Sequence, residues 1–509
     1  MLIPELLHQA AARFPDKPAA IFPEGRISFR ELDEKSNQVA QRLRRLGVQP
    51  NDRVALLWDN ALTGFIAFWG TLKAGAQNVD MPGLAGKATL EGILEESKPK
   101  ALAIDPKLYE KLGVDGVPAG LPKILLSEGN FPELPGHQVE RFEQIFQSEP
   151  KDRPPLTVDR HDPSLIVYTS GTTGRPKGVM LSHDNLISNI SAANQWVGLT
   201  HEDSILVVVP TYFIHGRMQI LTHAMIGGTL VFSAGFHFPK QVVQEIVESG
   251  VTGFSGVPYH MKTLLKTFKA TKFEKLRYVL VTGGALSVAE QETLQDALPG
   301  IGLHNAYGQT EASPRITYLG PKEMFVERGS SGRPLPGVTI DLVDDEGNLV
   351  PPGQPGEVAV RGPGIMKGYV SGDHVETGRI DSQGRLRTGD LGEFRGEYLY
   401  LVGRKSDMMK LAGERVFPKE IEDVINLHPA VTESAVFAVP DDRMGEKLHA
   451  FVVVHPGQSL DLAELRTHCL KHMSFVRTPR ELHLVPALPK TGSGKINRSE
   501  LKALLQPKS

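Results

Sequence analysis

The sequence of 509 residues contains one cysteine, Cys469. A single cysteine excludes an internal disulfide framework and a metal cluster held by several thiolates. Long hydrophobic runs are also missing, so we expect no membrane span, and the first residues lack the basic and apolar regions of a signal peptide. The formal net charge of -3 gives no electrostatic reason to expect nucleic acid or an anionic membrane as partner. We therefore expect a cytoplasmic protein that binds no nucleic acid.

A chain of 509 residues is too long for one hydrophobic core, so two or more domains are expected. Short apolar runs alternate with helical patterns, which predicts α/β layers over a largely parallel sheet. Residues 116–155 are rich in proline and glycine, and we expect irregular structure through most of them. β-strand patterns follow residue 331, and about the last hundred residues predict a small α+β domain. The main strand candidates are 53–57, 101–104, 124–126, 165–168, 205–209, 228–232, 253–257, 278–281, 338–343 and 356–362, and the main helix candidates are 27–47, 64–73, 184–197 and 241–247.

One stretch joins a predicted strand to a dense run of glycines and hydroxyls. Glycines that tolerate positive φ let successive N–H groups face one point, while the hydroxyls and Lys177 add donors and charge. The pattern predicts a loop that binds a polyphosphate, and a glycine-rich surface turn is the plainer alternative. It is not a Walker A loop, because Pro176 precedes Lys177 and Gly178 follows it. A second candidate, 492–495, also fails because Pro489 stands where the first glycine is required. The loop residues are Thr169, Ser170, Gly171, Thr172, Thr173 and Gly174.

The segment 168–178 closely resembles the phosphate loop of the adenylate-forming superfamily, which includes acyl-CoA synthetases, peptide adenylation domains and beetle luciferases. Further motifs follow in the family's order. Residues 307–311 are similar to its Y-G-x-T-E motif, 388–390 to its T-G-D motif, and 489–496 to its terminal lysine motif. Together these matches span most of the chain after residue 168.

The resemblance implies a particular fold and domain division. We expect a large N-terminal multi-layer α/β domain with a β-rich subdomain, residues 1–402, followed by a small hinged C-terminal α+β domain, residues 403–509. Aligned on the family's hinge motif, the pivot falls on Ser406, where relatives usually carry aspartate or lysine. The chain departs from the family pattern at this position.

The resemblance also implies which residues bind ATP and Mg²⁺. Tyr307 offers a face for adenine, and Glu311 supplies the hard oxygen ligand that Mg²⁺ prefers. Asp390 suits the ribose hydroxyls, while Arg404 reaches ribose and phosphate. The catalytic set is Lys495, Thr310, Glu311 and Lys177. The remaining predicted ATP contacts are the loop residues 169–174 with Gly283, Gly284, Ala285, Asn305, Ala306, Tyr307, Asp390 and Arg404.

The acid pocket is predicted after the strand at 205–209. In the family the matching segment supplies an aromatic or histidine wall, and many acyl-CoA synthetases carry histidine where this chain has Phe213. Two interpretations of His215 and Arg217 stay open. They are either a core histidine and a solvated arginine, or they bind a polar or second anionic group of the substrate.

These motifs together predict an ATP-dependent acid–thiol ligase. A carboxylic acid attacks ATP to give an acyl-adenylate and pyrophosphate, and a thiol then displaces AMP. CoA is the first choice of thiol, and the phosphopantetheine of a separate acyl carrier protein is the alternative. A luciferase-like oxygenase and a non-catalytic nucleotide-binding relative are further alternatives. The non-catalytic relative is disfavoured by the presence together of Lys177, Glu311, Asp390, Arg404 and Lys495.

Overall fold

The computed structural model describes residues 1–112, 120–169, 176–236, 238–284, 286–411, 414–441, 445–490 and 496–505. The chain divides into two compact units. Unit 1 comprises Met1–Ile340 and Val360–Leu386, and unit 2 comprises Asp341–Ala359 and Arg387–Ser509. The predicted fold class, α/β with a large N-terminal and a small C-terminal part, is confirmed. The predicted boundary after residue 402 falls within unit 2, so it stays a prediction of where the chain pivots.

Among the described residues, unit 1 contains two nine-stranded sheets in which most neighbouring strands run parallel. The first sheet has the order β16 (Arg333–Pro334), β15 (Thr317–Leu319), β14 (Gly302–Tyr307), β13 (Tyr278–Thr282), β12 (Gly253–Gly256), β10 (Ser204–Val207), β11 (Thr229–Phe232), β1 (Pro18–Phe22) and β2 (Gly25–Ser28). The second has the order β20 (His374–Glu376), β19 (Gly368–Ser371), β9 (Lys177–Ser182), β8 (Pro163–Thr169), β4 (Gln77–Asp80), β3 (Arg53–Leu57), β5 (Ala101–Ile104), β6 (Ile124–Ser127) and β7 (Gln138–Arg141).

Local sequence signals set the helix boundaries of unit 1. In α2 the Ser28 side chain accepts a hydrogen bond from the Glu31 N–H, and the Glu31 carboxylate accepts one in return from the Ser28 N–H, which together form a capping box. In the described part of the chain no helix is both long and apolar enough to cross a membrane. The helices are α1 (Ile3–Arg13), α2 (Phe29–Arg45), α3 (Leu62–Lys73), α4 (Lys87–Ser97), α5 (Pro106–Leu112), α6 (Phe142–Ser148), α7 (His183–Val197), α8 (Ile214–Ile226), α9 (Pro239–Ser249), α10 (Pro258–Lys269), α11 (Val288–Ala297) and α12 (Pro321–Val326).

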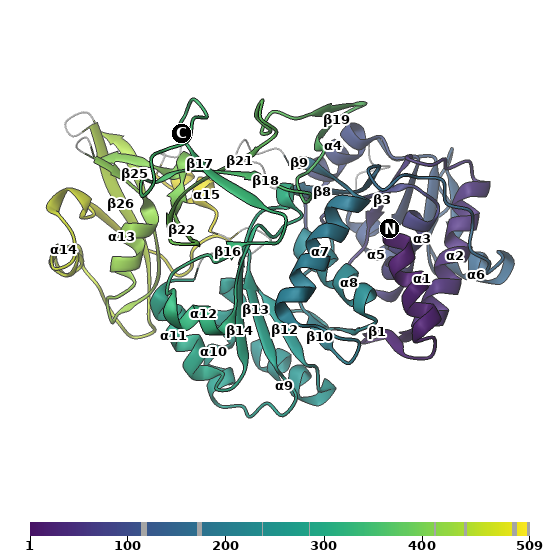
Figure 1. The fold of residues 1–509 in the computed structure, drawn as a ribbon, viewed down its shortest axis with the longest axis horizontal. Helices are drawn as coiled ribbons and strands as arrows, with labels where there is room; N and C mark the ends of the chain where they lie inside the picture. Colours follow the sequence, from purple (N-terminus) through teal and green to yellow (C-terminus); the bar gives the residue numbers. More distant parts are fainter. Residues whose placement is uncertain are drawn as a thin grey trace. The chain divides into compact units, whose positions relative to one another are not determined.

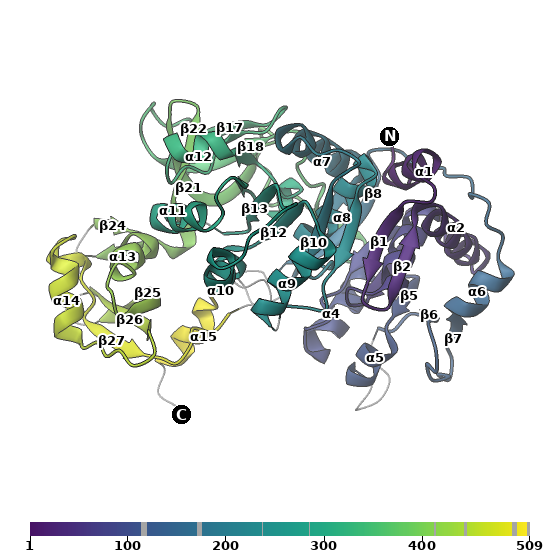
Figure 2. The ribbon, with the colours of Figure 1, turned by 90° about the horizontal axis from the view of Figure 1, so that it is seen from below.

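Two central helices lie between the sheets of unit 1. Helix α7 contacts β8 and β9 of the second sheet, α8 contacts β10 and β11 of the first sheet, and the two helices contact each other. Figure 1 and Figure 2 show α7 and α8 side by side. Unit 1 is therefore layered, and α8 lies where residues from both sheets can meet.

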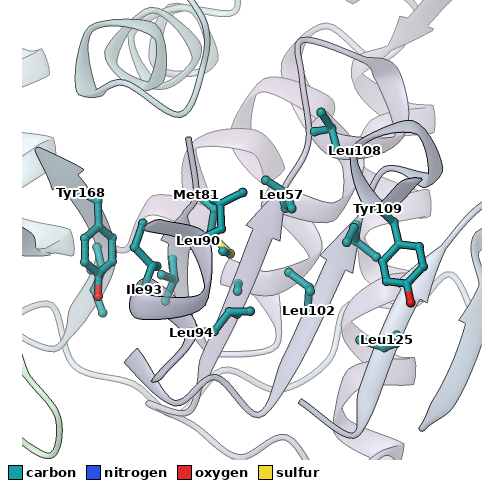
Figure 3. Packing of buried hydrophobic residues seen from close by; sticks show 14 of the residues in the cluster. Leu57, Met81, Leu90, Ile93, Leu94, Leu102, Leu108, Tyr109, Leu125 and Tyr168 are labelled. Carbon is teal, nitrogen blue, oxygen red and sulfur yellow. The ribbon is translucent and has the colours of Figure 1, made fainter. Parts of the chain in front are cut away.

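The core under the second sheet holds the strand that precedes the glycine loop. Figure 3 shows Leu90, Ile93 and Leu94 of α4 beside Leu57 and Leu102 of the sheet. The aromatic ring at the end of β8, Tyr168, belongs to the same cluster and is 6% exposed. This packing fixes the end of β8 and hence the start of the loop that follows it.

The expectation of irregular structure through most of 116–155 is wrong in part. Besides β6, which lies at the predicted strand, this region forms β7 and α6. Tertiary contacts order it: Phe142 and Ile145 are buried, and Arg42 donates two hydrogen bonds to the Glu140 carboxylate, at 2.9 and 2.8 Å. These partners lie in α2, far away in sequence, so the local pattern gave no signal of them.

Unit 2 has the predicted α+β character. A four-stranded sheet has the order β17 (Thr339–Val343), β18 (Gly356–Arg361), β21 (Leu386–Arg395) and β22 (Tyr398–Arg404). A hairpin of β23 (Met409–Leu411) and β24 (Glu414–Val416) follows. A three-stranded sheet comprises β25 (Val431–Asp441), β26 (Gly445–Val454) and β27 (Glu481–Leu484), with helices α13 (Pro418–Ile425), α14 (Leu462–Leu470) and α15 (Arg498–Ala503). Buried Ile421, Val436, Ala450 and Leu465 give unit 2 a core of its own.

Candidate functional site

The ends of the glycine loop are fixed by a strand hairpin. Strands β8 and β9 pair antiparallel, with Thr169 opposite Lys177 and Tyr168 opposite Gly178. The Thr169 hydroxyl donates to the Lys177 carbonyl at 3.4 Å, and a Cβ added at Gly178 would lie 2.9 Å from Tyr168 Cζ. The predicted phosphate-binding residues Ser170, Gly171, Thr172, Thr173 and Gly174 lie outside the described residues. The loop therefore leaves and enters the sheet at adjacent, paired positions.

Two predicted catalytic residues lie on either side of one tyrosine. Lys177 Nζ is 5.2 Å from the centre of the Tyr369 ring. The Tyr369 hydroxyl donates to Glu311 Oε1 at 2.7 Å. Tyr369 belongs to β19, which pairs with β9 so that Tyr369 lies opposite Val179. The structure thus brings together two motifs that the sequence separates by more than a hundred residues.

Glu311 has a geometry that suits a single-carboxylate Mg²⁺ site. It is buried in a short 3₁₀ turn, Thr310–Ala312, which directly follows β14 and Gly308–Gln309, and its carbonyl accepts from Met366 N at 2.9 Å. Oε1 also accepts a hydrogen bond from Arg379 Nη1 at 3.3 Å. Within the described residues Oε2 has no hydrogen-bond partner, so this oxygen can face a cation. No group of three or more His, Cys, Asp or Glu side chains that could hold a metal occurs there either, so phosphate or water oxygens would complete the coordination.

Tyr369 acts as a hydrogen-bond donor in this arrangement. Burial, the Glu311 charge and their hydrogen bond all raise the pKa of Tyr369, so its hydroxyl keeps its proton. A protonated hydroxyl can hold the carboxylate in one orientation. Tyr369 is therefore placed to orient Glu311.

The predicted adenine site lies at the carboxyl edge of the first sheet. Strands β13 and β14 are parallel, with Thr282 opposite Ala306, so the Gly283–Gly284 turn and Tyr307 emerge at the same edge. Gly283 has φ +79°, and a Cβ at Gly308 would lie 1.8 Å from the Pro314 carbonyl oxygen, so both positions need glycine. Asn305 is buried within β14, and Thr310 lies in the following turn. The predicted contact Ala285 lies outside the described residues.

The predicted acid-pocket residues begin helix α8. Phe213 is its N-cap residue and packs against Tyr212, with ring centres 4.6 Å apart. His215 Nε2 lies 2.8 Å from the hydroxyl of Ser255 in β12. Burial, followed by the charges of Arg315 and His260, lowers the pKa of His215 to about 3. His215 is therefore neutral near pH 7 and offers a hydrogen bond rather than a charge.

Arg217 lies in the same helix but is bonded to the protein. Its Nε donates to Asp80 Oδ2 at 2.7 Å and its Nη2 to Asp80 Oδ1 at 2.6 Å. The guanidinium also lies 4.1 Å from the centre of the Phe68 ring. The side chain is 3% exposed, so the interpretation of Arg217 as a solvated arginine is wrong. Its role in substrate binding stays a prediction, with the guanidinium already held by Asp80.

Unit 2 brings together the two predicted ribose-binding residues. Asp390 in β21 lies opposite Arg404 in β22, and Arg404 Nε donates to Asp390 Oδ1 at 3.1 Å. The preceding residues fix the turn, since the Thr388 hydroxyl donates to the Val358 carbonyl at 2.8 Å and Gly389 has φ +76°. The predicted pivot, Ser406, is exposed and lies in the 3₁₀ turn Lys405–Asp407 that follows β22.

The predicted catalytic Lys495 lies outside the described residues, but the base of its loop is described. Lys490 and Ile496 form an antiparallel bridge, and Asn497 N donates to the Pro489 carbonyl at 2.8 Å. Arg498 Nη2 then donates to Glu422 Oε1 at 2.6 Å. The residues on either side of 491–495 are thus paired with each other, and Arg498 is tied to α13 of unit 2.

Three side chains that act on the predicted site residues belong to no motif and are not among the residues predicted from the sequence. Tyr369 and Arg379 contact Glu311, and Arg315 lies close enough to His215 to lower its pKa. In the sequence, the only hint at Arg315 was an arginine in an otherwise apolar stretch directly after the Y-G-x-T-E motif. Their importance comes from contacts between distant segments.

Comparison with known proteins agrees with these motifs. The family model described as AMP-binding enzyme matches residues 7–370, and that described as AMP-binding enzyme C-terminal domain matches residues 420–495. The chain is similar to a long-chain-fatty-acid–CoA ligase of Escherichia coli O6:H1, with 32% identity over 98% of this chain and 93% of the relative. It is 31% identical to a 2-succinylbenzoate–CoA ligase of Listeria monocytogenes serotype 4b, over 96% of each chain.

Solved structures show the same similarity. The anthranilate CoA ligase AuaEII in complex with anthranoyl-AMP has a TM-score of 0.90 and 27% identity, covering 99% of this chain and 97% of that one. The O-succinylbenzoate CoA synthetase MenE of Bacillus subtilis, in complex with ATP and a magnesium ion, has a TM-score of 0.83 and 26% identity, covering 98% and 99%. Proteins of this architecture therefore bind ATP, magnesium and acyl-adenylates.

Proposed function

The chain belongs to the AMP-binding enzyme family, and from this premise we propose that it is an AMP-forming acid–thiol ligase. It activates a carboxylic acid as an acyl-adenylate and transfers the acyl group to the thiol of CoA. The single observation that carries the proposal is the meeting of Lys177 and Glu311 at Tyr369. The relatives named as CoA ligases support CoA as the acceptor.

In the first step a carboxylate oxygen forms a bond to the α-phosphorus of ATP, and the bond to the β-phosphate oxygen breaks. Pyrophosphate leaves with its electron pair. Negative charge accumulates around phosphorus, so the protein's contribution is mainly electrostatic. Lys177 supplies a positive charge beside the glycine loop, and Tyr369 and Arg379 hold the Glu311 carboxylate, which would be the protein ligand of Mg²⁺. Mg²⁺, when bound, would neutralise charge on the phosphate oxygens.

In the second step a thiol sulfur attacks the acyl carbon, and the bond to the AMP oxygen breaks. The thiol proton goes to solvent or to a nearby base, and AMP leaves with the former carboxylate oxygen. Lys495 serves the first step only, as the resemblance implies, and the part of the chain after Ser406, which carries it, turns between the steps. Asp390 and Arg404 hold the ribose in both.

A screen of carboxylic acids by pyrophosphate release tests the proposal. Some acids should release pyrophosphate with ATP and Mg²⁺, and adding CoA should then give AMP and a thioester in equal amounts. An acyl carrier protein bearing phosphopantetheine, supplied in place of CoA, tests the alternative acceptor. If no acid in a broad screen stimulates pyrophosphate release, the proposed activity is wrong.

The cytoplasm stays the predicted compartment, and cell fractionation tests it.

A further inference from the structure

A cavity lies in unit 1 between helices α7 and α8 and the first sheet. It encloses about 470 Å³ of space that protein atoms do not fill, part of it open to solvent. Strands β10 and β12 to β15 contribute to its walls, together with residues of both helices. The cavity thus lies on the side of α8 that faces the first sheet.

The walls of this cavity carry several polar atoms without partners. Five of the six side chains concerned are more than nine-tenths buried. A buried polar atom without a hydrogen bond is costly, and native proteins leave few of them. So many in one cavity indicate that water or a polar ligand group completes their hydrogen bonds. The atoms are Asn194 Oδ1, Gln219 Nε2 and Oε1, Thr222 Oγ1, His223 Nε2, Tyr278 Oη and Arg315 Nη1.

Arg315 is the exceptional member because it is a cation. Its side chain is buried, the residue being 7% exposed, and no Asp or Glu of the described chain forms an ion pair with it. Burial lowers its pKa to about 10, so it stays charged near neutral pH. Two nearby arginines have carboxylate partners, the buried Arg217 with Asp80 and the exposed Arg277 with Asp203. A buried charge without a counter-ion is strongly disfavoured, so Arg315 is placed to bind an anion.

The cavity continues from the predicted acid pocket. His215, Gln219 and Thr222 follow one another at helical spacing on one face of α8, over about 10 Å of helix axis. Ser255, which bonds to His215, lines the cavity, and so does Ala306, next to the predicted adenine-stacking Tyr307. The Arg315 charge acts on both His215 and His223, at the two ends of this face. An acid that enters beside His215 would therefore extend toward Arg315.

We propose that this cavity is the far end of the acid-binding site and that Arg315 binds a second carboxylate of the substrate. The inference rests on the proposed function and names its substrate class, a dicarboxylic acid. Tyr278 Oη and Gln219 Nε2 can donate to the same carboxylate. His223 is different: its Nδ1 donates to the Gln219 carbonyl at 3.0 Å, so its neutral ring offers Nε2 as an acceptor, which suits the Thr222 hydroxyl or a water.

The test compares dicarboxylic acids with monocarboxylic acids of the same chain length, in the wild type and in Arg315→Met. Methionine keeps an unbranched chain of similar reach and removes the charge. Wild type should favour a diacid, and Arg315→Met should lower kcat/KM for that diacid about 100-fold, as expected when one partner of a buried charged pair is lost. The variant should leave kcat/KM for the monoacid unchanged or raise it. The matched control, Arg277→Met, should keep the preference for the diacid.

Thermal unfolding of the full-length protein gives a readout that needs no turnover. Without ligand, Arg315→Met should melt at or above the wild-type temperature, because an unpaired buried charge has been removed. Arg277→Met should melt lower, because Asp203 then loses its partner. The diacid should raise the melting temperature of the wild type but not that of Arg315→Met. If Arg315→Met melts as low as the control, Arg315 has a protein partner and the inference is wrong.

These outcomes separate the inference from the proposed function. If acids are activated but Arg315→Met treats diacids and monoacids alike, the second-carboxylate site is overturned and the ligase activity stands. If no acid is activated, the ligase activity fails, while a diacid-dependent rise in melting temperature that Arg315→Met abolishes would still support the site. If diacids give no such rise and no preference, the cavity holds water alone.

Discussion

Replacing Arg217 with leucine should destabilise unit 1 strongly, because the Asp80 carboxylate would stay buried without its cation. Two hydrogen bonds of 2.7 and 2.6 Å join the two side chains, which are 3% and 0% exposed. The pair connects the first turn of α8 to the end of β4. Its loss should therefore disturb both the layer between the sheets and the start of the acid pocket.

The magnitude follows from this burial. Removing one partner of a buried ion pair typically costs about 3–5 kcal/mol, most of it from the charge left behind. In the double variant Asp80→Asn with Arg217→Met no charge is left unpaired, so much of that stability should return. Arg277→Leu is a matched control, since Arg277 is 41% exposed and Asp203 would keep its hydrogen bonds from Thr200 and Thr252. Its cost should be about 1–2 kcal/mol, as for a partly exposed pair.

Urea denaturation followed by tryptophan fluorescence measures this effect selectively. The three tryptophans of the chain, Trp58, Trp69 and Trp196, all belong to unit 1, so their transition reports on that unit. Kinetic parameters for an activated acid are measured on the same samples. If Arg217→Leu unfolds within about 1 kcal/mol of wild type but raises KM for the acid tenfold, Arg217 binds substrate and the ion-pair account is wrong.

Three further predictions concern the metal site, Lys495 and acid stability. Tyr369→Phe removes a hydrogen bond to the Glu311 carboxylate, so adenylation should slow about tenfold and need more Mg²⁺; an unchanged Mg²⁺ dependence of pyrophosphate release would contradict this. Lys495→Ala should slow acyl-adenylate formation by about 10²–10³ yet still convert synthetic acyl-adenylate to thioester with CoA; equal loss in both half-reactions would exclude a lysine that serves one step. Burial acts to raise the pKa of Asp203, but hydrogen bonds, of which that from Arg277 is the largest, lower it to about 2. The ionised Asp203 therefore stabilises the fold fully at pH values above the usual aspartate pKa, and this stabilisation is lost as the pH falls toward 2. Asp203→Asn should therefore be less stable at pH 7 and lose less stability between pH 5 and pH 3, and an unchanged acid dependence in urea unfolding would refute this.

The sequence predicted best what local patterns determine. The capping box at Ser28 places the start of α2, and the apolar run 101–104 is β5 as observed. The glycine loop was located because its strand, turn and lysine are contiguous. These signals depend on residues only a few positions apart, so the sequence pattern contains all the residues that form them.

Contacts between distant segments were beyond such patterns. Asp80 and Arg217 are 137 positions apart, and Tyr369 and Glu311 are 58 apart, with no motif at either Asp80 or Tyr369. From the sequence alone Arg217 is therefore expected to be solvated or to bind substrate, whereas its actual partner, Asp80, lies in the second sheet. No sequence pattern marks Arg315, because what distinguishes it is that it is buried without a carboxylate partner. Only the packed structure shows this.

The most direct test of the central claim follows one oxygen atom. An acid that supports turnover is labelled with oxygen-18 in its carboxylate and incubated with ATP, Mg²⁺ and CoA, and the AMP is analysed by mass spectrometry. If the acid attacks the α-phosphorus and the thiol then displaces AMP, each AMP carries one oxygen atom from the acid. AMP without the label, formed together with the thioester, would show that no acyl-adenylate lies on the path.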